Sequence, residues 1–148
     1  MGKSLRILGI VNFPWDPRLG GARVWFELSE QWEKAGHRID RFSLGDAFPK
    51  ATTSRALSAW RQAIFPYRAA RFVRDHADRF DVIDCVIGAL PFPKKSMRFR
   101  GLLVARSIGL YLAYDEFIRM SRKRWPDQPR GKFIGGETLV APLSLAIC

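Results

Sequence analysis

The sequence is poor in cysteine and has no long uninterrupted apolar run. Its 148 residues include two cysteines, Cys85 and Cys148, which give neither a disulfide framework nor the spacing of a metal site. No apolar run approaches the roughly 20 residues that a membrane-spanning helix needs. The amino terminus has no small-residue cleavage site after its apolar run, so we interpret it as a first strand rather than a signal peptide. These absences favour a cytoplasmic protein without a metal site.

The glycine pattern of dinucleotide-binding enzymes is also missing. That pattern, G-x-G-x-x-G, lies directly between a strand and a helix. Here residues 12–19 separate the first apolar run from Gly20 and Gly21, and no third glycine follows at the required spacing. We therefore expect no nicotinamide or flavin cofactor.

What is present is the composition of a globular domain, with 47% hydrophobic and 26% charged residues. Apolar runs typical of buried strands alternate with segments of helical spacing. The four runs span residues 5–11, 37–42, 81–88 and 102–107. The alternation predicts an α/β fold, with a Rossmann-like open parallel sheet of at least four strands and helices on both faces.

Three segments show the spacing of helices. The first begins at Ala22, and Gly36 is placed where a left-handed residue commonly ends a helix. The second carries an apolar stripe that we expect to be buried, and Pro66 is expected to interrupt it and start a new helix. That stripe is formed by Leu57, Trp60 and Ile64, and the next buried stripe, after Pro66, is expected at Ala69, Val73, Ala77 and Phe80. The third is a basic amphipathic helix at residues 111–124.

Positive charge is concentrated in the last third of the chain. The net charge is +11, and residues 94–132 hold eleven basic residues against three acidic ones, an excess of eight. The basic helix has aromatic neighbours, so it is either a solvated helix face or a surface for anionic membrane. Charge alone also permits nucleic-acid binding, but no recognition motif accompanies it, and we do not expect it.

The best local signal for a binding site is Gly20–Gly21 at the entrance to the first helix. Free N–H groups and the helix dipole favour a phosphate or carboxylate at such a place. The alternative, that the two glycines only let the loop turn, carries equal weight. Arg106 and Ser107 form a second candidate site, because ligands of open α/β sheets bind at the carboxyl ends of the strands.

The remaining polar residues carry less weight as site residues. His37 follows a helix end, and we expect a structural role for it. His76 lies among charged residues and is expected at the surface. Asp81 and Asp84 bracket the start of a strand, where a capping or surface role is expected rather than acid–base catalysis.

Several segments together resemble the opening of family 4 retaining glycosyltransferases. These enzymes begin with a strand, a proline-containing loop, Gly-Gly-Ala, a helix ending in Gly-His, and a second strand. The matching segments lie at residues 7–24, 34–39, 81–84 and 104–110, and the resemblance covers about residues 5–132. The spacing from Gly-Gly-Ala to Gly-His is its most specific part.

The resemblance implies that residues 1–132 form the Rossmann-like, acceptor-side domain of a GT-B enzyme. In the family the glycine-rich loop lies near the donor diphosphate and the acceptor, which corresponds to Gly20 and Gly21. A His-Gly pair commonly follows the fourth strand, where this chain has Ile108–Gly109, so the imidazole is missing. The expected binding residues are therefore Gly20, Gly21, Arg106, Ser107 and Gly109. No catalytic residue and no metal ligand is assigned.

The family's second domain, which supplies most nucleotide-sugar contacts, is not among these residues. Residues 133–148 are apolar and unpatterned, and we expect an irregular tail that begins a truncated part, and a chain inactive alone. The expected partners are a nucleotide-sugar, as substrate rather than cofactor, and a sugar or lipid-linked acceptor, in the cytoplasm or on the inner membrane face. The alternative is a non-catalytic α/β module that binds an anion or a membrane.

Overall fold

The computed structural model describes residues 3–107 and 111–126. Residues 1–106 form one compact unit, and the helix that follows belongs to a second unit, residues 107–148; the two are described separately. The predicted tail at 133–148 and Gly109 lie outside the described residues.

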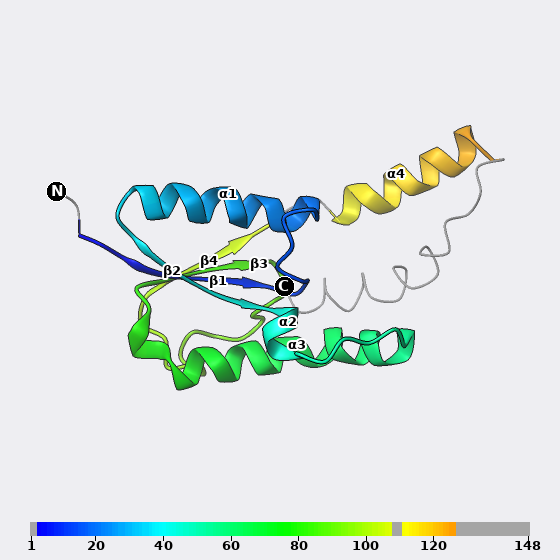
Figure 1. Cartoon of the computed structure of the whole chain (residues 1–148). Helices are drawn as coiled ribbons and strands as arrows, with labels where there is room; N and C mark the ends of the chain where they lie inside the picture. Colours follow the sequence, from blue (N-terminus) through cyan, green and yellow to red (C-terminus); the bar gives the residue numbers. More distant parts are fainter. Residues whose placement is uncertain (1–2, 108–110, 127–148) are drawn as a thin grey trace. The chain divides into compact units, whose positions relative to one another are not determined.

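Strands and helices alternate along the first unit (Figure 1). The elements are β1 (Arg6–Val11), α1 (Gly20–Lys34), β2 (Arg38–Ser43), α2 (Leu44–Ala47), α3 (Arg55–Asp75), a 3-10 turn (Ala77–Arg79), β3 (Val82–Val86) and β4 (Leu102–Arg106). The strands form one sheet in the order β2-β1-β3-β4, and every pairing is parallel. The α/β fold with a parallel sheet is thus confirmed.

Helices cover both faces of the sheet, with α1 on one side and α3 on the other (Figure 1). Every residue of β1 after Arg6 is consequently buried. A side chain at Gly9 would approach the Trp15 ring to 3.2 Å and the Trp25 ring to 3.4 Å. The missing side chain therefore lets both indoles pack over the middle of the sheet on the α1 side.

The end of α1 agrees with the prediction from Gly36. This glycine has a φ of +85°. Its N–H group donates to Glu33 O at 2.9 Å, and the next N–H, from His37, donates to Trp32 O at 3.0 Å. These two bonds satisfy the last carbonyl groups of the helix, as a left-handed glycine at this position allows.

The prediction for α3 was wrong in two respects. Pro66 lies inside one continuous helix, and Leu57 and Trp60 are 41% and 52% exposed. Ala69, Val73 and Phe80 are buried as predicted, and Ala69 and Val73 form, with Phe65, the side of α3 that packs on the sheet. Because this side packs on the sheet around Pro66, tertiary contacts compensate for the hydrogen bond that the proline cannot make.

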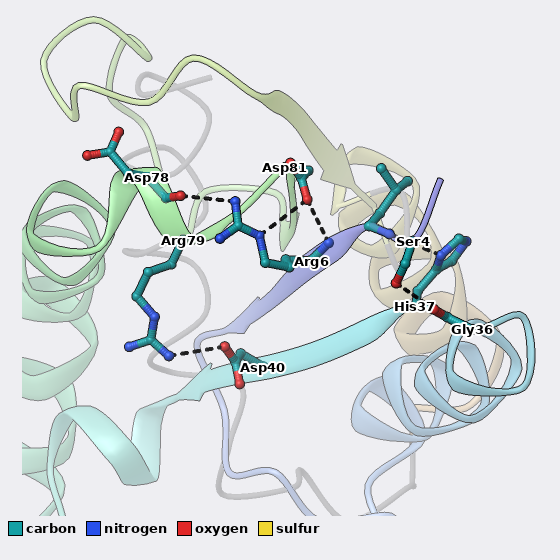
Figure 2. Close-up of polar contacts among 9 residues, drawn as sticks. Ser4, Arg6, Gly36, His37, Asp40, Asp78, Arg79 and Asp81 are labelled. Atoms are coloured by element: carbon teal, nitrogen blue, oxygen red, sulfur yellow. Dashed lines mark hydrogen bonds and ion pairs between the residues drawn. The ribbon is translucent and has the colours of Figure 1, made fainter. Parts of the chain in front are cut away.

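Polar contacts tie the strands together at their amino ends (Figure 2). The Asp81 carboxylate accepts from the backbone N–H of Arg6 at 2.8 Å, which lowers the pKa of Asp81. The His37 ring accepts at Nδ1 from the N–H of Leu5 at 3.3 Å, and Ser4 Oγ donates to Gly36 O at 2.6 Å. His37 and Asp81 therefore hold the chain at the edge opposite to the carboxyl ends of the strands.

Candidate functional site

The order of the strands singles out one place at the carboxyl edge of the sheet. The chain passes from β1 through α1 to β2 on one side, and then through α3 to β3 on the other side of β1. Strand order therefore reverses between β1 and β3. Ligands of open α/β sheets bind outside the carboxyl ends at such a switch point. The loop from β1 to α1, residues 12–19, lies beside it.

Asp16 organises that loop. Its carboxylate accepts from the backbone N–H of Arg18 at 3.0 Å and from Arg18 Nε at 2.9 Å. Its carbonyl oxygen accepts from the N–H of Leu19 at 3.0 Å. The hydrogen bonds from Arg18 lower the pKa of Asp16 from 3.8 to about 2. The loop thus enters α1 in a fixed conformation, with the Arg18 side chain 88% exposed.

The amino terminus of α1 has no side-chain cap. Its N-cap residue is Leu19, whose side chain cannot accept a hydrogen bond, and the first turn contains no acidic residue. The first N–H to bond back to Leu19 O is that of Arg23, at 3.0 Å. The N–H groups of Gly20 and Gly21 precede it, and helices normally close this position with Ser, Thr, Asp or Asn. The first turn is therefore suited to an external anion.

Neither glycine is required here by backbone strain. Positive φ values among the described glycines occur at Gly36 and Gly88, not at Gly20 or Gly21. A Cβ atom at Gly20 would meet nothing within 4 Å. The two glycines are therefore not explained by a left-handed turn. The other explanation, that they leave the backbone accessible to a ligand, remains.

Arg106 and Asp84 form an ion pair across β4 and β3. Arg106 Nε lies 3.2 Å from Asp84 Oδ1, and Nη2 donates to Oδ2. Asp84 is 2% exposed, so the expected capping or surface role for it was wrong. Bonding to Asp84 raises the pKa of Arg106. The charge of Arg106 is thus already compensated within the protein.

The other predicted site residues are spread along the same edge. Ser107 directly follows β4 and is exposed. Because β3 separates β1 from β4, the ends of these two strands lie two strand spacings, or roughly 10 Å, apart. Within the first unit, the end of β1 and Arg106 at the end of β4 therefore lie along one edge without forming one tight cluster.

Two further features carry less chemistry. Cys85 is buried, and burial raises the pKa of its thiol to about 12, which leaves it unreactive. A shallow groove of about 340 Å³ lies beside α3, and charged side chains that line it already have polar partners within the protein. In this groove Arg71 lies 3.7 Å from Asp75, and Asp46 accepts from the N–H of Ser43 at 2.8 Å.

The described residues also show neither a metal site nor a spanning helix. Within them, no group of three or more His, Cys, Asp or Glu side chains could hold a metal ion. Over the same ranges, no helix combines the length and the apolar character needed to cross a membrane.

The basic helix predicted at residues 111–124 is α4 (Tyr111–Arg124). Arg119, Arg122, Lys123 and Arg124 on it are exposed, and Trp125 after it is 52% exposed. The helix is confirmed, while its predicted contact with a membrane remains a prediction.

Comparisons with protein-family models, with curated proteins and with solved structures find no match to this chain. The case for a function is therefore built on the geometry at the carboxyl edge of the sheet.

Proposed function

We propose that the first turn of α1 binds the diphosphate of a nucleotide-sugar, and that residues 1–132 act as the acceptor-side domain of a GT-B glycosyltransferase. The observation that carries the proposal is the uncapped amino terminus of α1, with Gly20 and Gly21 in its first turn, beside the switch point of a parallel sheet. Helix N-terminal N–H groups and the helix dipole together stabilise phosphate.

The same arrangement supplies what sugar transfer needs at the leaving group. Charge develops on the departing diphosphate, and preorganised N–H donors aimed at it lower the barrier. Glycine at both positions leaves the backbone accessible, and the exposed Arg18 side chain stands just before them. This chemistry runs through positioning and electrostatic stabilisation, with Ser107 and Gly109 after β4 as further binding residues in the proposal.

A second candidate is a non-catalytic module that binds an anion. It is favoured by the pairing of the nearby carboxylates, because Asp84 is bound to Arg106 and Asp16 to Arg18. Neither carboxylate is then available as a general base. Both candidates place the anion at Gly20 and Gly21, so they differ in turnover and not in binding.

Binding is tested by amide NMR of the 148-residue protein titrated with UDP, GDP and pyrophosphate. We expect the amide signals of Gly20 and Gly21 to shift most. Gly20→Val should weaken binding at least about tenfold, or roughly 1.4 kcal/mol. It should leave the melting temperature near that of the parent, since the space around Gly20 is open.

Gly45→Val is the matched control. Gly45 also lies in a first helical turn, where a Cβ has ordinary contacts, but a capping box between Ser43 and Asp46 already closes that helix. The control should bind as the parent does. Shifts confined to other parts of the chain, or undiminished binding by Gly20→Val, would exclude the α1 terminus as the anion site.

A further inference from the structure

Helix α3 carries a second apolar stripe that the first unit covers only in part, through a contact of Tyr67 with the Phe92 ring at 5.4 Å and of Trp60 with the Phe48 ring at 6.0 Å. The sheet-facing side is formed by Phe65, Ala69 and Val73. The second stripe lies roughly half a turn away around the helix. Its apolar residues are spaced by three and four positions, and two arginines continue the same spacing. This surface, called the outer face of α3 below, comprises Leu57, Trp60, Ile64, Tyr67, Arg71 and Arg74.

The apolar part of the outer face is exposed to solvent. Leu57 is 41%, Trp60 52% and Tyr67 63% exposed, and Ile64 is half-buried. In Figure 1 the amino half of α3 extends past the carboxyl ends of the strands. A soluble surface normally scatters its large apolar residues singly, so a stripe of them marks a contact surface.

The surroundings of this stripe carry an excess of positive charge, with Arg71 paired to Asp75 at 3.7 Å. Residues 48–74 contain one lysine and five arginines and no aspartate or glutamate. Arg61 and Arg68 lie over the Phe48 ring, at 5.4 and 4.4 Å from its centroid. Trp60 meets the same ring edge-on at 6.0 Å. Phe48 thus holds two of the cations beside the exposed indole.

Contact with the β1 loop fixes the amino half of α3 against the rest of the unit. Gln62 Nε2 donates to the carbonyl oxygen of Asn12 at 2.9 Å, just after β1. Ser54 caps the helix by accepting from the N–H of Leu57. The extended half of α3 is therefore a formed, anchored helix, and its apolar stripe is presented to the outside.

We propose that the outer face of α3 binds an anionic lipid surface. Trp and Tyr side chains favour the membrane–water interface because their rings are apolar and their tips polar. Arginines beside them gain electrostatic attraction to anionic headgroups. Nucleic acid is less suitable, because it would contact the cations but not the apolar residues Leu57 and Ile64. A second copy of the chain is also less suitable, because it would bring like charges together. This inference does not rest on the proposed function.

The test is sedimentation of the full chain with vesicles of phosphatidylcholine alone and of an equal mixture with phosphatidylglycerol. We expect binding to the anionic vesicles, strongly reduced by high salt because screening shortens the range of the attraction. Trp60→Ala should weaken this binding at least about fivefold. Leu102→Ala is the control, since Leu102 is 60% exposed on β4, away from the outer face, and it should bind as the parent does.

A charge comparison separates α3 from α4. The double variant Arg71→Gln, Arg74→Gln should weaken binding at least about fivefold, since an unpaired arginine near an anionic surface contributes about fivefold and Arg71 is paired with Asp75. The pair Arg119→Gln, Arg122→Gln removes the same charge from α4 and should have a smaller effect. Melting curves check that each variant is folded, and Leu57→Ser repeats the apolar test at a second exposed position.

Several results would overturn the proposal. These are absence of binding to anionic vesicles at low salt, loss of binding only in the α4 variants, binding to DNA without binding to vesicles, and formation of a dimer that Trp60→Ala abolishes. Protection of Trp60 from a soluble quencher in the free protein would show that another part of the chain covers the face, and would equally reject it.

Discussion

The two residues of the Asp84–Arg106 ion pair differ strongly in their exposure to solvent. Asp84 is almost fully buried, whereas the Arg106 side chain is 33% exposed. Arg106 can therefore turn to water if its partner is lost, but Asp84 cannot. Leaving a buried charge without its partner typically costs about 3–5 kcal/mol.

We accordingly expect Arg106→Met to lower the free energy of unfolding by about 3–5 kcal/mol, and Asp84→Leu to lower it by less. The double variant should be more stable than the sum of the two losses predicts, because it leaves no buried charge. Urea unfolding of the four proteins measures this cycle. If the losses in unfolding free energy of the two single variants simply add up in the double variant, the ion pair contributes little to stability. Arg106 would then have a role other than stabilising the fold.

The thiol of Cys85 makes stability depend on alkaline pH. In the folded protein its pKa is raised from 9.0 to about 12 by burial and by the neighbouring Asp84. Below pH 9 the thiol is protonated in both states and its contribution to stability is complete. Above pH 9 it ionises in the unfolded chain first, so stability falls as pH rises toward 12, by about 1.4 kcal/mol per pH unit.

Comparing the parent with Cys85→Ala isolates this dependence, because lysines and tyrosines titrate in both proteins. The parent should lose stability more steeply between pH 9 and pH 11. Equal slopes would show that Cys85 is accessible to water and that burial does not hold its proton.

At the scale of elements, α3 shows what periodicity can and cannot decide. The spacing of Leu57, Trp60 and Ile64 predicts a helix correctly, but not which side of it faces the sheet. Phe65, Ala69 and Val73 form a competing stripe on the same helix, and only packing against the strands selects between the two. Pro66 predicts a break because it lacks a backbone N–H group, but contacts with the sheet on both sides of Pro66 keep the helix continuous.

Where one local feature suffices, the sequence predicts the structure well. Gly36 ends α1 because a positive φ is needed there, and the apolar runs become strands because both faces of a parallel sheet are buried. The pairing of Asp84 with Arg106 could not be predicted in this way. It depends on β3 and β4 being adjacent, and the sequence alone does not fix strand order.

Across the whole first unit, the two edges of the sheet differ in how the backbone groups beside them are closed. The amino edge is closed by side-chain contacts, among them Arg6 with Asp81 and Arg79 with Asp40 at 3.5 Å (Figure 2). At the carboxyl edge the first turn of α1 has no cap. Under the proposed function, the uncapped turn at one edge is open to a ligand, while the contacts at the other edge hold the strands in register.

The arrangement also predicts what the first unit can do alone. Under the proposed function, the α1 turn contacts one side of the donor diphosphate, and most donor contacts belong to a second domain. We therefore expect the 148-residue protein to bind nucleoside diphosphates without transferring sugar. Binding by the N–H groups of one helical turn can hold the leaving group, but transfer also requires the donor sugar to be oriented against an acceptor.

Incubation with a panel of nucleotide-sugars, with product measured under multiple-turnover conditions, tests this expectation. Gly20→Val serves as the control for contaminating activity, because the activity of a transferase that copurifies by chance would be the same in both preparations. Turnover by the parent that Gly20→Val abolishes would contradict the prediction, and would mean that one unit provides both donor and acceptor contacts. Binding without turnover would leave the α1 turn as a diphosphate site that requires a second domain to act.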